Sequence, residues 1–293
     1  MKCNKLNLCA LRLFLLILSL MVMSQARSQD TAASRDTAGT GTKPHSLFTS
    51  LGYGTNMICL GSTISGDQSY GYGAVTYGFR NKFYLTASGV HLSGREPFGA
   101  FYTGTAAYSH TFSSWFDISA DLSGYLVAPE LADTLFNSFV YGSITLGLDW
   151  RILYTRITTG AVAVSGTRPY LMIRNSRYFE TPEFTSKKFY FTFDPYINIL
   201  AGSMTKAETT SGTSVATSPP FRKKDNDGQG SASTKYTTFY SLIEVDFGLP
   251  VSFNAGRFTI EAEPAYILPV YEDEEYPGIK GFNFLLSVYI RIL

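Results

Sequence analysis

His91 and Ser93 are the residues whose types and spacing are most typical of catalysis. Residues two apart on a β-strand point to the same face, so the two side chains are expected side by side. A histidine placed this way removes the proton of a serine hydroxyl and makes it a nucleophile, provided that a third polar residue orients the ring. The sequence offers no convincing orienting carboxylate or amide. We therefore expect two polar residues at a strand–loop boundary, with lipid-ester hydrolysis as the alternative.

A second set of candidate residues is charged and follows the polar phase of predicted strands. Residues of one phase share one face of a sheet. Buried polar groups need partners, so this phase predicts a network of ion pairs and hydrogen bonds that either fills a narrow interior or lines a passage. The members are Asp117, Asp121, Asp149, Arg151, Arg156, Asp194, Glu244, Asp246, Glu261, Glu263 and Arg291.

Other chemistries have weak signals. His45 and His110 lie far apart, and no spacing of His, Cys and Asp resembles a zinc or iron site. Gly71 and Gly73 lack the strand–helix setting of a phosphate-binding loop. The run 222–228 lacks the bidentate Glu of a calcium loop. We expect neither a metal nor a cofactor.

The N-terminus predicts export. Basic residues without an acid precede an apolar run at 13–23, and Ser24-Gln25-Ala26 supplies small residues at a cleavage site. The run is shorter than the roughly 20 residues that span a bilayer. We expect a signal peptide at 1–26 and a flexible leader at 27–44, which has no large apolar side chain. Cleavage leaves Cys59 as the single cysteine, so no intramolecular disulfide is expected.

Composition narrows the class of protein. The 293 residues are 45% hydrophobic, 15% aromatic and only 16% charged. Soluble domains usually carry about a quarter charged residues. The 24 Lys+Arg against 23 Asp+Glu give no basic excess, so no nucleic-acid partner is expected.

Alternation dominates the chain from Leu47 onward. Apolar and polar residues alternate in 116–123, 143–151 and 282–292, among other segments. Such a period predicts strands with one apolar and one polar face. A soluble β-sandwich also alternates. Long strands, alternately short and long connections and the export signal favour a transmembrane barrel, which lipid requires to be closed.

The connections predict an all-β, antiparallel, up-and-down barrel at 45–293. An even number of strands places both termini at the periplasmic end, and about twelve fit, with ten as the alternative if weak strands merge. The expected strands are 45–56, 69–80, 83–93, 99–112, 115–127, 138–152, 154–165, 168–178, 187–204, 236–253, 257–270 and 281–293.

One hairpin predicts a register for the charged residues. If it turns at Asn254-Ala255, Asp246 lies opposite Glu263 on the inner face. Like charges directly opposed are destabilising, so a cation, an arginine or a shift in protonation is expected to relieve them. Arg291 is expected on the same face, at a depth close to that of Glu261.

With the export signal at 1–26, the Gly-aromatic strand Tyr70–Phe79 and the terminal strand Phe282–Leu293, the sequence resembles bacterial outer-membrane β-barrel proteins of unassigned activity. The resemblance implies an outer-membrane location, lipid contacts and insertion by the barrel-assembly machinery. Members usually end on an aromatic residue, where this chain has Leu293. The aromatic residues fit the belts at the two membrane interfaces, although β-propensity favours them as well.

Three functions follow as hypotheses. The first is a non-catalytic barrel with a charged lumen, acting as a narrow channel for small solutes or as a structural element. The second is a lipid-ester hydrolase, since outer-membrane phospholipases and lipid A deacylases use a His-x-Ser pair; Gly94 follows Ser93 where the deacylase pattern has Asn. The third is surface binding through the Ser/Thr/Gly-rich loop 205–235.

Overall fold

The computed structural model describes residues 44–132, 134–163, 167–184, 189–209, 212–216, 235–271 and 278–293. The predicted signal peptide at 1–26, nearly all of the predicted leader at 27–44 and most of the loop 205–235 lie outside these residues. No helix in the described part of the chain is long and apolar enough to cross a membrane.

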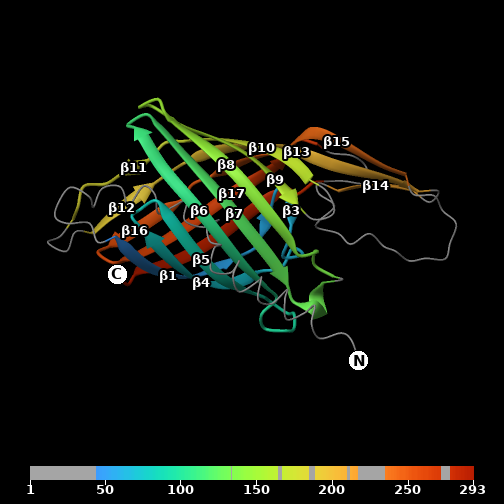
Figure 1. Cartoon of the computed structure of the whole chain (residues 1–293), viewed down its shortest axis with the longest axis horizontal. Coiled ribbons are helices and arrows are strands. Elements are labelled where there is room, and N and C mark those ends of the chain that lie inside the picture. The colour runs from blue at the N-terminus through green and yellow to red at the C-terminus, as the bar shows by residue number, and fades with distance from the viewer. Residues whose placement is uncertain are drawn as a thin grey trace.

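The described chain forms a closed antiparallel barrel in which each strand pairs with its neighbours in sequence order, and β18 pairs with both β17 and β1 (Figure 1). The expectation of about twelve strands is confirmed. The wall consists of β1 (His45–Gly54), β4 (Tyr70–Phe79), β5 (Phe83–Leu92), β6 (Phe101–Ser113), β7 (Phe116–Val127), β8 (Phe139–Asp149), β9 (Tyr154–Ala163), β10 (Thr167–Ser176), β12 with β13 (Phe189–Phe193 and Tyr196–Thr209), β15 with β16 (Lys235–Gly248 and Val251–Ala255), β17 (Phe258–Pro269) and β18 (Gly281–Arg291).

Two of the strands that cross the wall are interrupted by proline. Pro195 separates β12 from β13, and Pro250 separates β15 from β16. Proline has no N–H to donate to a neighbouring strand, so the inter-strand hydrogen bonding is interrupted there, while the chain continues in the same direction. The short strand β11 (Phe179–Glu180) continues β10 and pairs with β12.

The two ends of the barrel differ. Short turns, such as Gly256-Arg257 and 80–82, gather at the end that holds His45 and the C-terminus, here called the short-turn end. The opposite, long-loop end carries the segments 55–69, 93–100 and 128–138. The strand β13 runs to Thr209, where β14 (Gly212–Ala216) pairs with it, so the expected loop start at residue 205 is wrong. Figure 1 shows β13, β14 and β15 extending beyond the other strands.

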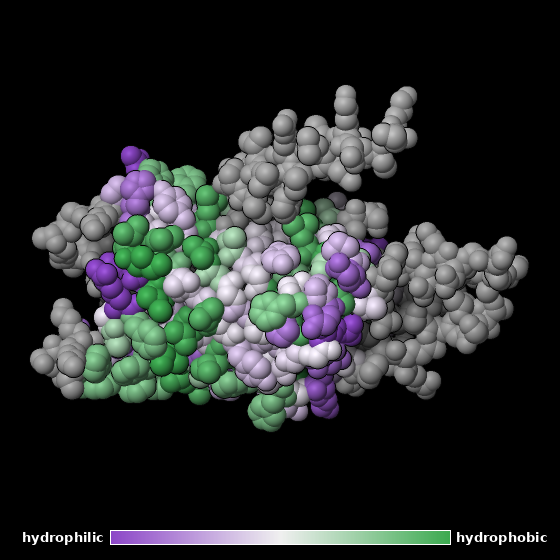
Figure 2. Space-filling view, turned by 90° about the horizontal axis from the view of Figure 1, so that it is seen from below, coloured by the Kyte–Doolittle hydropathy of each residue, from purple (hydrophilic) through white to green (hydrophobic). Residues whose placement is uncertain are grey.

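The alternation predicted from the sequence separates the two faces of the wall. In β8, Ser143, Thr145 and Gly147 are buried inside, while Ile144 and Leu146 are exposed outside. Figure 2 shows hydrophobic residues gathered across the outer surface, with hydrophilic residues toward its ends.

The predicted register of the last hairpins is wrong. The turn lies at Gly256-Arg257, with Gly256 at a φ of 64° that favours glycine, and not at Asn254-Ala255. Moving the apex by two residues shifts the pairing by four, which preserves the face of every side chain. Asp246 consequently pairs with Ile267 and not with Glu263.

Candidate functional site

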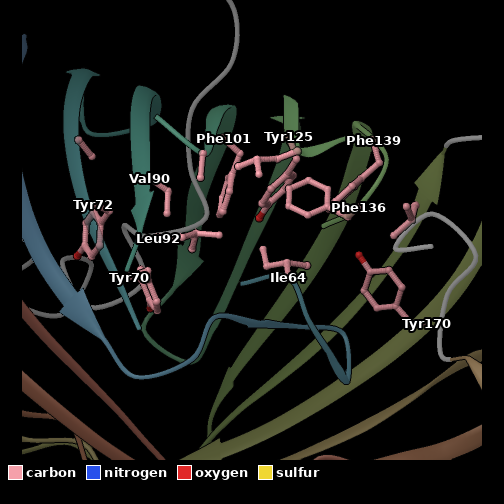
Figure 3. Close-up of a cluster of buried hydrophobic side chains, with 14 of the residues drawn as sticks. Ile64, Tyr70, Tyr72, Val90, Leu92, Phe101, Tyr125, Phe136, Phe139 and Tyr170 are labelled. Carbon is pink, nitrogen blue, oxygen red and sulfur yellow. The ribbon is translucent and has the colours of Figure 1, made fainter. Parts of the chain in front are cut away.

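An apolar cluster fills the lumen near the long-loop end. We call it the plug. Its wall residues come from strands β4 to β15, the loops 55–69 and 128–138 add Ile64, Leu131 and Phe136, and the loop 93–100 adds Ala100. Figure 3 shows the side chains converging on the space enclosed by the wall. The members of the cluster are Ile64, Tyr70, Tyr72, Ala74, Val90, Leu92, Ala100, Phe101, Tyr125, Leu131, Phe136, Phe139, Val162, Tyr170, Leu200, Met204 and Ile243.

The first loop of the plug, 55–69, is organised around Asn56. Its Nδ2 donates to Asp67 Oδ1 (2.8 Å), and its Oδ1 accepts from Thr63 Oγ1 (2.7 Å) and Ser65 Oγ (2.8 Å). The short strands β2 (Ile58–Cys59) and β3 (Ser62–Thr63) pair below this network. A single amide therefore fixes the loop in a shape that inserts Ile64 into the lumen.

The second loop, 128–138, contains the 3-10 turn η2 (Pro129–Leu131) and inserts Phe136. Phe136 is only 2% exposed. Its ring meets Phe101 edge to face at 5.2 Å and Phe139 at 5.7 Å, which is the favoured geometry of aromatic pairs. Phe136 thus connects the loop to strands β6 and β8 on the barrel wall.

Cys59 lies on the first loop and packs against the plug. Burial, together with a smaller effect of the negative charge of Glu244, raises the pKa of its thiol to about 12. A thiol in this state is a weak nucleophile, because the thiolate is the reactive form. Cys59 is a free cysteine whose reactivity depends on the plug remaining in place.

Toward the short-turn end the lumen becomes polar and charged. Arg174 lies directly opposite Asn198, and Asn198 lies opposite Asp246, so the three share a row on β10, β13 and β15. The guanidinium of Arg174 covers the ring of Tyr196 at 3.6 Å and lies 3.8 Å from Asp194 Oδ2. Arg156, on β9, lies directly opposite Arg174, so two arginines neighbour each other on this side of the lumen.

A β-bulge places an acid at the boundary between plug and charged lumen. Leu200 pairs with Glu244 but Ala201 pairs with Leu242, so Ile243 is an extra residue in β15. Ile243 and Glu244 are consequently both buried, at 3% and 5% exposure. Asp246 follows on the same face and accepts a hydrogen bond from Asn198 Nδ2 (3.0 Å).

The remaining predicted acids have separate partners. Glu263 accepts from Tyr196 Oη (2.8 Å), and Glu261 accepts from Ser252 Oγ (2.7 Å). On the opposite wall, Asp117 accepts from Tyr154 Oη (2.8 Å), and Asp121 accepts from Ser143. The predicted charged residues therefore form two groups on different walls, one on β7 and one on β13 to β17.

Three predicted members lie at the rim and not inside. Asp149 ends β8, and its carboxylate accepts from the backbone N–H of Arg151 (2.7 Å) in the turn that follows. Arg151 has a φ of 70° and is exposed, because the strand ends at Asp149, three residues earlier than expected. Arg291 is exposed at the end of β18, four residues beyond the partner of Glu261, so the expected common depth is wrong.

His91 and Ser93 make separate contacts in the structure. Although both residues are described, no hydrogen bond joins them. The His91 ring stacks on Phe98 at 4.5 Å, and its Nδ1 is 2.9 Å from the Phe98 carbonyl oxygen. Ser93 lies past the end of β5 and contributes a backbone N–H to Ser69 (2.9 Å). Within the described residues, no group of three or more His, Cys, Asp and Glu side chains is arranged to hold a metal ion.

Sequence reasoning missed the residues that matter most for this interior. The polar phase of the strands includes Arg174, Tyr196 and Asn198, and this phase could have identified them as inward-facing residues. Gly248, opposite Tyr196, was a second signal, because a Cβ at that position would overlap the tyrosine ring. The sequence contains no comparable signal for the plug, because the loops that contribute to it have no periodic pattern.

No protein-family model and no curated protein matches the sequence. The chain is similar in structure to LpxR from Salmonella typhimurium, with 6% identity and a TM-score of 0.43 over 83% of this chain and 99% of that one. It is also similar to CdiB from Acinetobacter baumannii, with 10% identity and a TM-score of 0.35 over 86% of this chain and 61% of that one. Both likenesses concern the fold alone.

Proposed function

We propose that the protein spans the bacterial outer membrane and acts there as a narrow passage for small cationic solutes, closed in the present conformation by the plug. The support for the membrane is the outer surface of the barrel. Exposed aliphatic residues such as Leu51, Val75, Leu122 and Ile144 lie at intermediate heights on the wall. An apolar band of this kind faces lipid in membrane barrels.

Aromatic residues flank the aliphatic band at both ends, as expected for side chains at membrane interfaces. Exposing such large rings to water is unfavourable, whereas the membrane interface accommodates them. At the short-turn end they are Phe83, Phe112, Trp115, Trp150 and Phe179, and at the long-loop end Tyr53, Phe98, Tyr102, Tyr240 and Phe282. On this orientation the long loops face outward, and the chain reaches the membrane with the help of the barrel-assembly machinery.

The observation that carries the passage is the composition of the plug. A barrel that is only structural can fill its lumen from the wall. Here two loops outside the wall contribute Ile64, Leu131 and Phe136 to the closure. Loops rearrange at a lower free-energy cost than strands of a closed sheet, so the closure is removable while the wall stays intact.

Charge sets the solute class. Carboxylates outnumber arginines along the described lumen wall, so the interior attracts cations. The acids are Asp117, Asp121, Asp194, Glu244, Asp246, Glu261 and Glu263. The arginines are Arg156, Arg174 and Arg168, which lies on β10 and donates to Thr205 Oγ1.

Planar-bilayer recording of the refolded protein tests the proposal. The native protein should be nearly silent, and a variant with a weakened plug, Phe136→Ala, should conduct with a reversal potential that indicates cation preference. Cys59 labelling reports independently whether the plug has opened. An opened plug without conductance would leave a structural barrel as the function.

The other two hypotheses have less support. The geometry of His91 and Ser93 does not favour hydrolysis, and most of the 205–235 loop lies outside the described residues. A non-catalytic role is therefore part of the proposal.

A further inference from the structure

The boundary between plug and charged lumen contains polar groups that have no partner. Asn198 is 9% exposed, and while its Nδ2 donates to Asp246, its Oδ1 has no hydrogen-bond partner. The second oxygen of Asp246, Oδ1, is also buried without a partner. A buried acceptor that is left unsatisfied destabilises the folded state. The two acceptors lie on directly opposed residues, and Nε of Arg174, which pairs with Asn198 from the other side, is also buried without a partner.

Glu244 adds charge to the same place. It lies two residues from Asp246 on the same strand and face, and it is 5% exposed. The described residues provide no hydrogen bond or ion pair to its carboxylate. Two carboxylates this close repel each other, and either a proton held by one of them or a cation beside them relieves the repulsion.

The charge of the nearby Arg174 acts on Asp246, but Arg174 forms no ion pair with Asp246 or Glu244. Arg174 faces Asn198 but directs its guanidinium toward Asp194 and the ring of Tyr196. Glu263 is occupied by Tyr196 Oη. Around Glu244 and Asp246, carboxylates therefore outnumber cationic side chains, and Asn198 Oδ1 and Asp246 Oδ1 accept no hydrogen bond from the chain.

We propose that Glu244, Asp246 and Asn198 form a binding site for an organic cation with N–H donors, a primary ammonium or a guanidinium group. Acceptors that lack donors select for N–H, and the two carboxylates supply the attraction for positive charge. Hydrogen bonds to charged groups are about twice as strong as those between neutral groups. The plug covers the site from the long-loop side, since Ile243 belongs to the plug and Glu244 follows it directly.

This site deepens the proposed function and rests on it, because the cation reaches the site through the charged lumen. It gives the passage a selectivity based on N–H donors and not on charge alone. The solute would stop at the point where the plug begins.

The test is calorimetric titration of the folded full-length mature protein in neutral-detergent micelles. Methylammonium and guanidinium are the probes, and tetramethylammonium is the control, with equal charge and no N–H. We expect saturable binding of the two donors and at least tenfold weaker binding of tetramethylammonium. Equal binding of all three cations would reduce the site to general electrostatics and overturn the proposal.

Variants locate the binding. Glu244→Gln and Asp246→Asn should each weaken methylammonium binding at least tenfold, and Asn198→Leu should remove the preference for N–H donors. Glu183→Gln removes the same charge from an exposed position outside the lumen and should leave binding unchanged. Unchanged binding in both acid variants, with native heat-modifiable migration, would overturn the site.

The outcome is separable from that of the conductance experiment, because micelle titration requires no ion flow. Conductance without selective binding would contradict only the site. Selective binding without conductance in a plug-opened variant would contradict only the passage.

Discussion

Replacing Phe136 by alanine is the sharpest perturbation of the plug. The ring is 2% exposed and contacts both Phe101 and Phe139. Truncating a buried phenylalanine costs about 3–5 kcal/mol, through lost burial and the cavity that remains. This loss falls on the attachment of the 128–138 loop to the wall, because the barrel strands keep their own hydrogen bonds.

The thiol of Cys59 supplies the assay. It packs against the plug, and its raised pKa keeps it unreactive while the plug is in place. Where labelling at pH 8 proceeds through opening, a loss of about 3–5 kcal/mol increases the labelling rate roughly a hundred- to several-thousand-fold. Phe282→Ala is the matched control, since Phe282 is 85% exposed on the outer surface.

The expected result is rapid labelling of the Phe136 variant, with slow labelling of the native protein and of the Phe282 variant. All three should show the heat-modifiable migration of a folded barrel. Slow labelling in a folded Phe136→Ala protein would refute the assignment of Phe136 as the anchor of the plug.

Further predictions concern the plug, the lumen and the membrane. Asn56→Ala should also accelerate Cys59 labelling, because it removes three hydrogen bonds that contribute about 0.5–1.5 kcal/mol each; equal rates in native and variant protein would exclude Asn56 as the organiser of the loop. Labelling of folded native protein should remain slow near pH 9 and rise only toward pH 12, because the folded pKa of Cys59 is raised and the neutral thiol persists until then; a midpoint near 9 would show a solvated thiol. Ile144→Lys places a charge in the outer apolar band and should lower the free energy of unfolding from lipid vesicles by about 2–4 kcal/mol in urea titration; no change would contradict the membrane-facing assignment. Arg174→Gln in a Phe136→Ala background should increase the cation preference in reversal-potential measurements, and a shift toward anions would contradict the position of Arg174 in the passage.

Much of the wall was predictable because a strand encodes its face locally. Alternation in 116–123 and 143–151 separates inside from outside regardless of pairing partner. Register is harder, since it depends on the exact apex of each turn. Gly256, and not the Asn254-Ala255 pair, provides the positive φ of the turn. Because the turn lies two residues later than predicted, Asp246 pairs with Ile267 and not with Glu263.

The interior was less predictable for a different reason. Its contacts join residues far apart in sequence, such as Phe101 with Phe136 and Tyr72 with Ser287. The bulge that buries both Ile243 and Glu244 breaks the alternation that the prediction relied on. Inward phase identified Glu244 and Asp246 as candidates, but only the folded arrangement brings Asn198 and Arg174 beside them.

The most direct test of the central claim is the planar-bilayer conductance of native protein and of Phe136→Ala, recorded on preparations whose Cys59 labelling has been measured. A closed passage predicts a silent native protein and a conducting, cation-preferring variant in which Cys59 is rapidly labelled. A variant that labels rapidly and remains silent would contradict the claim that the plug closes a passage.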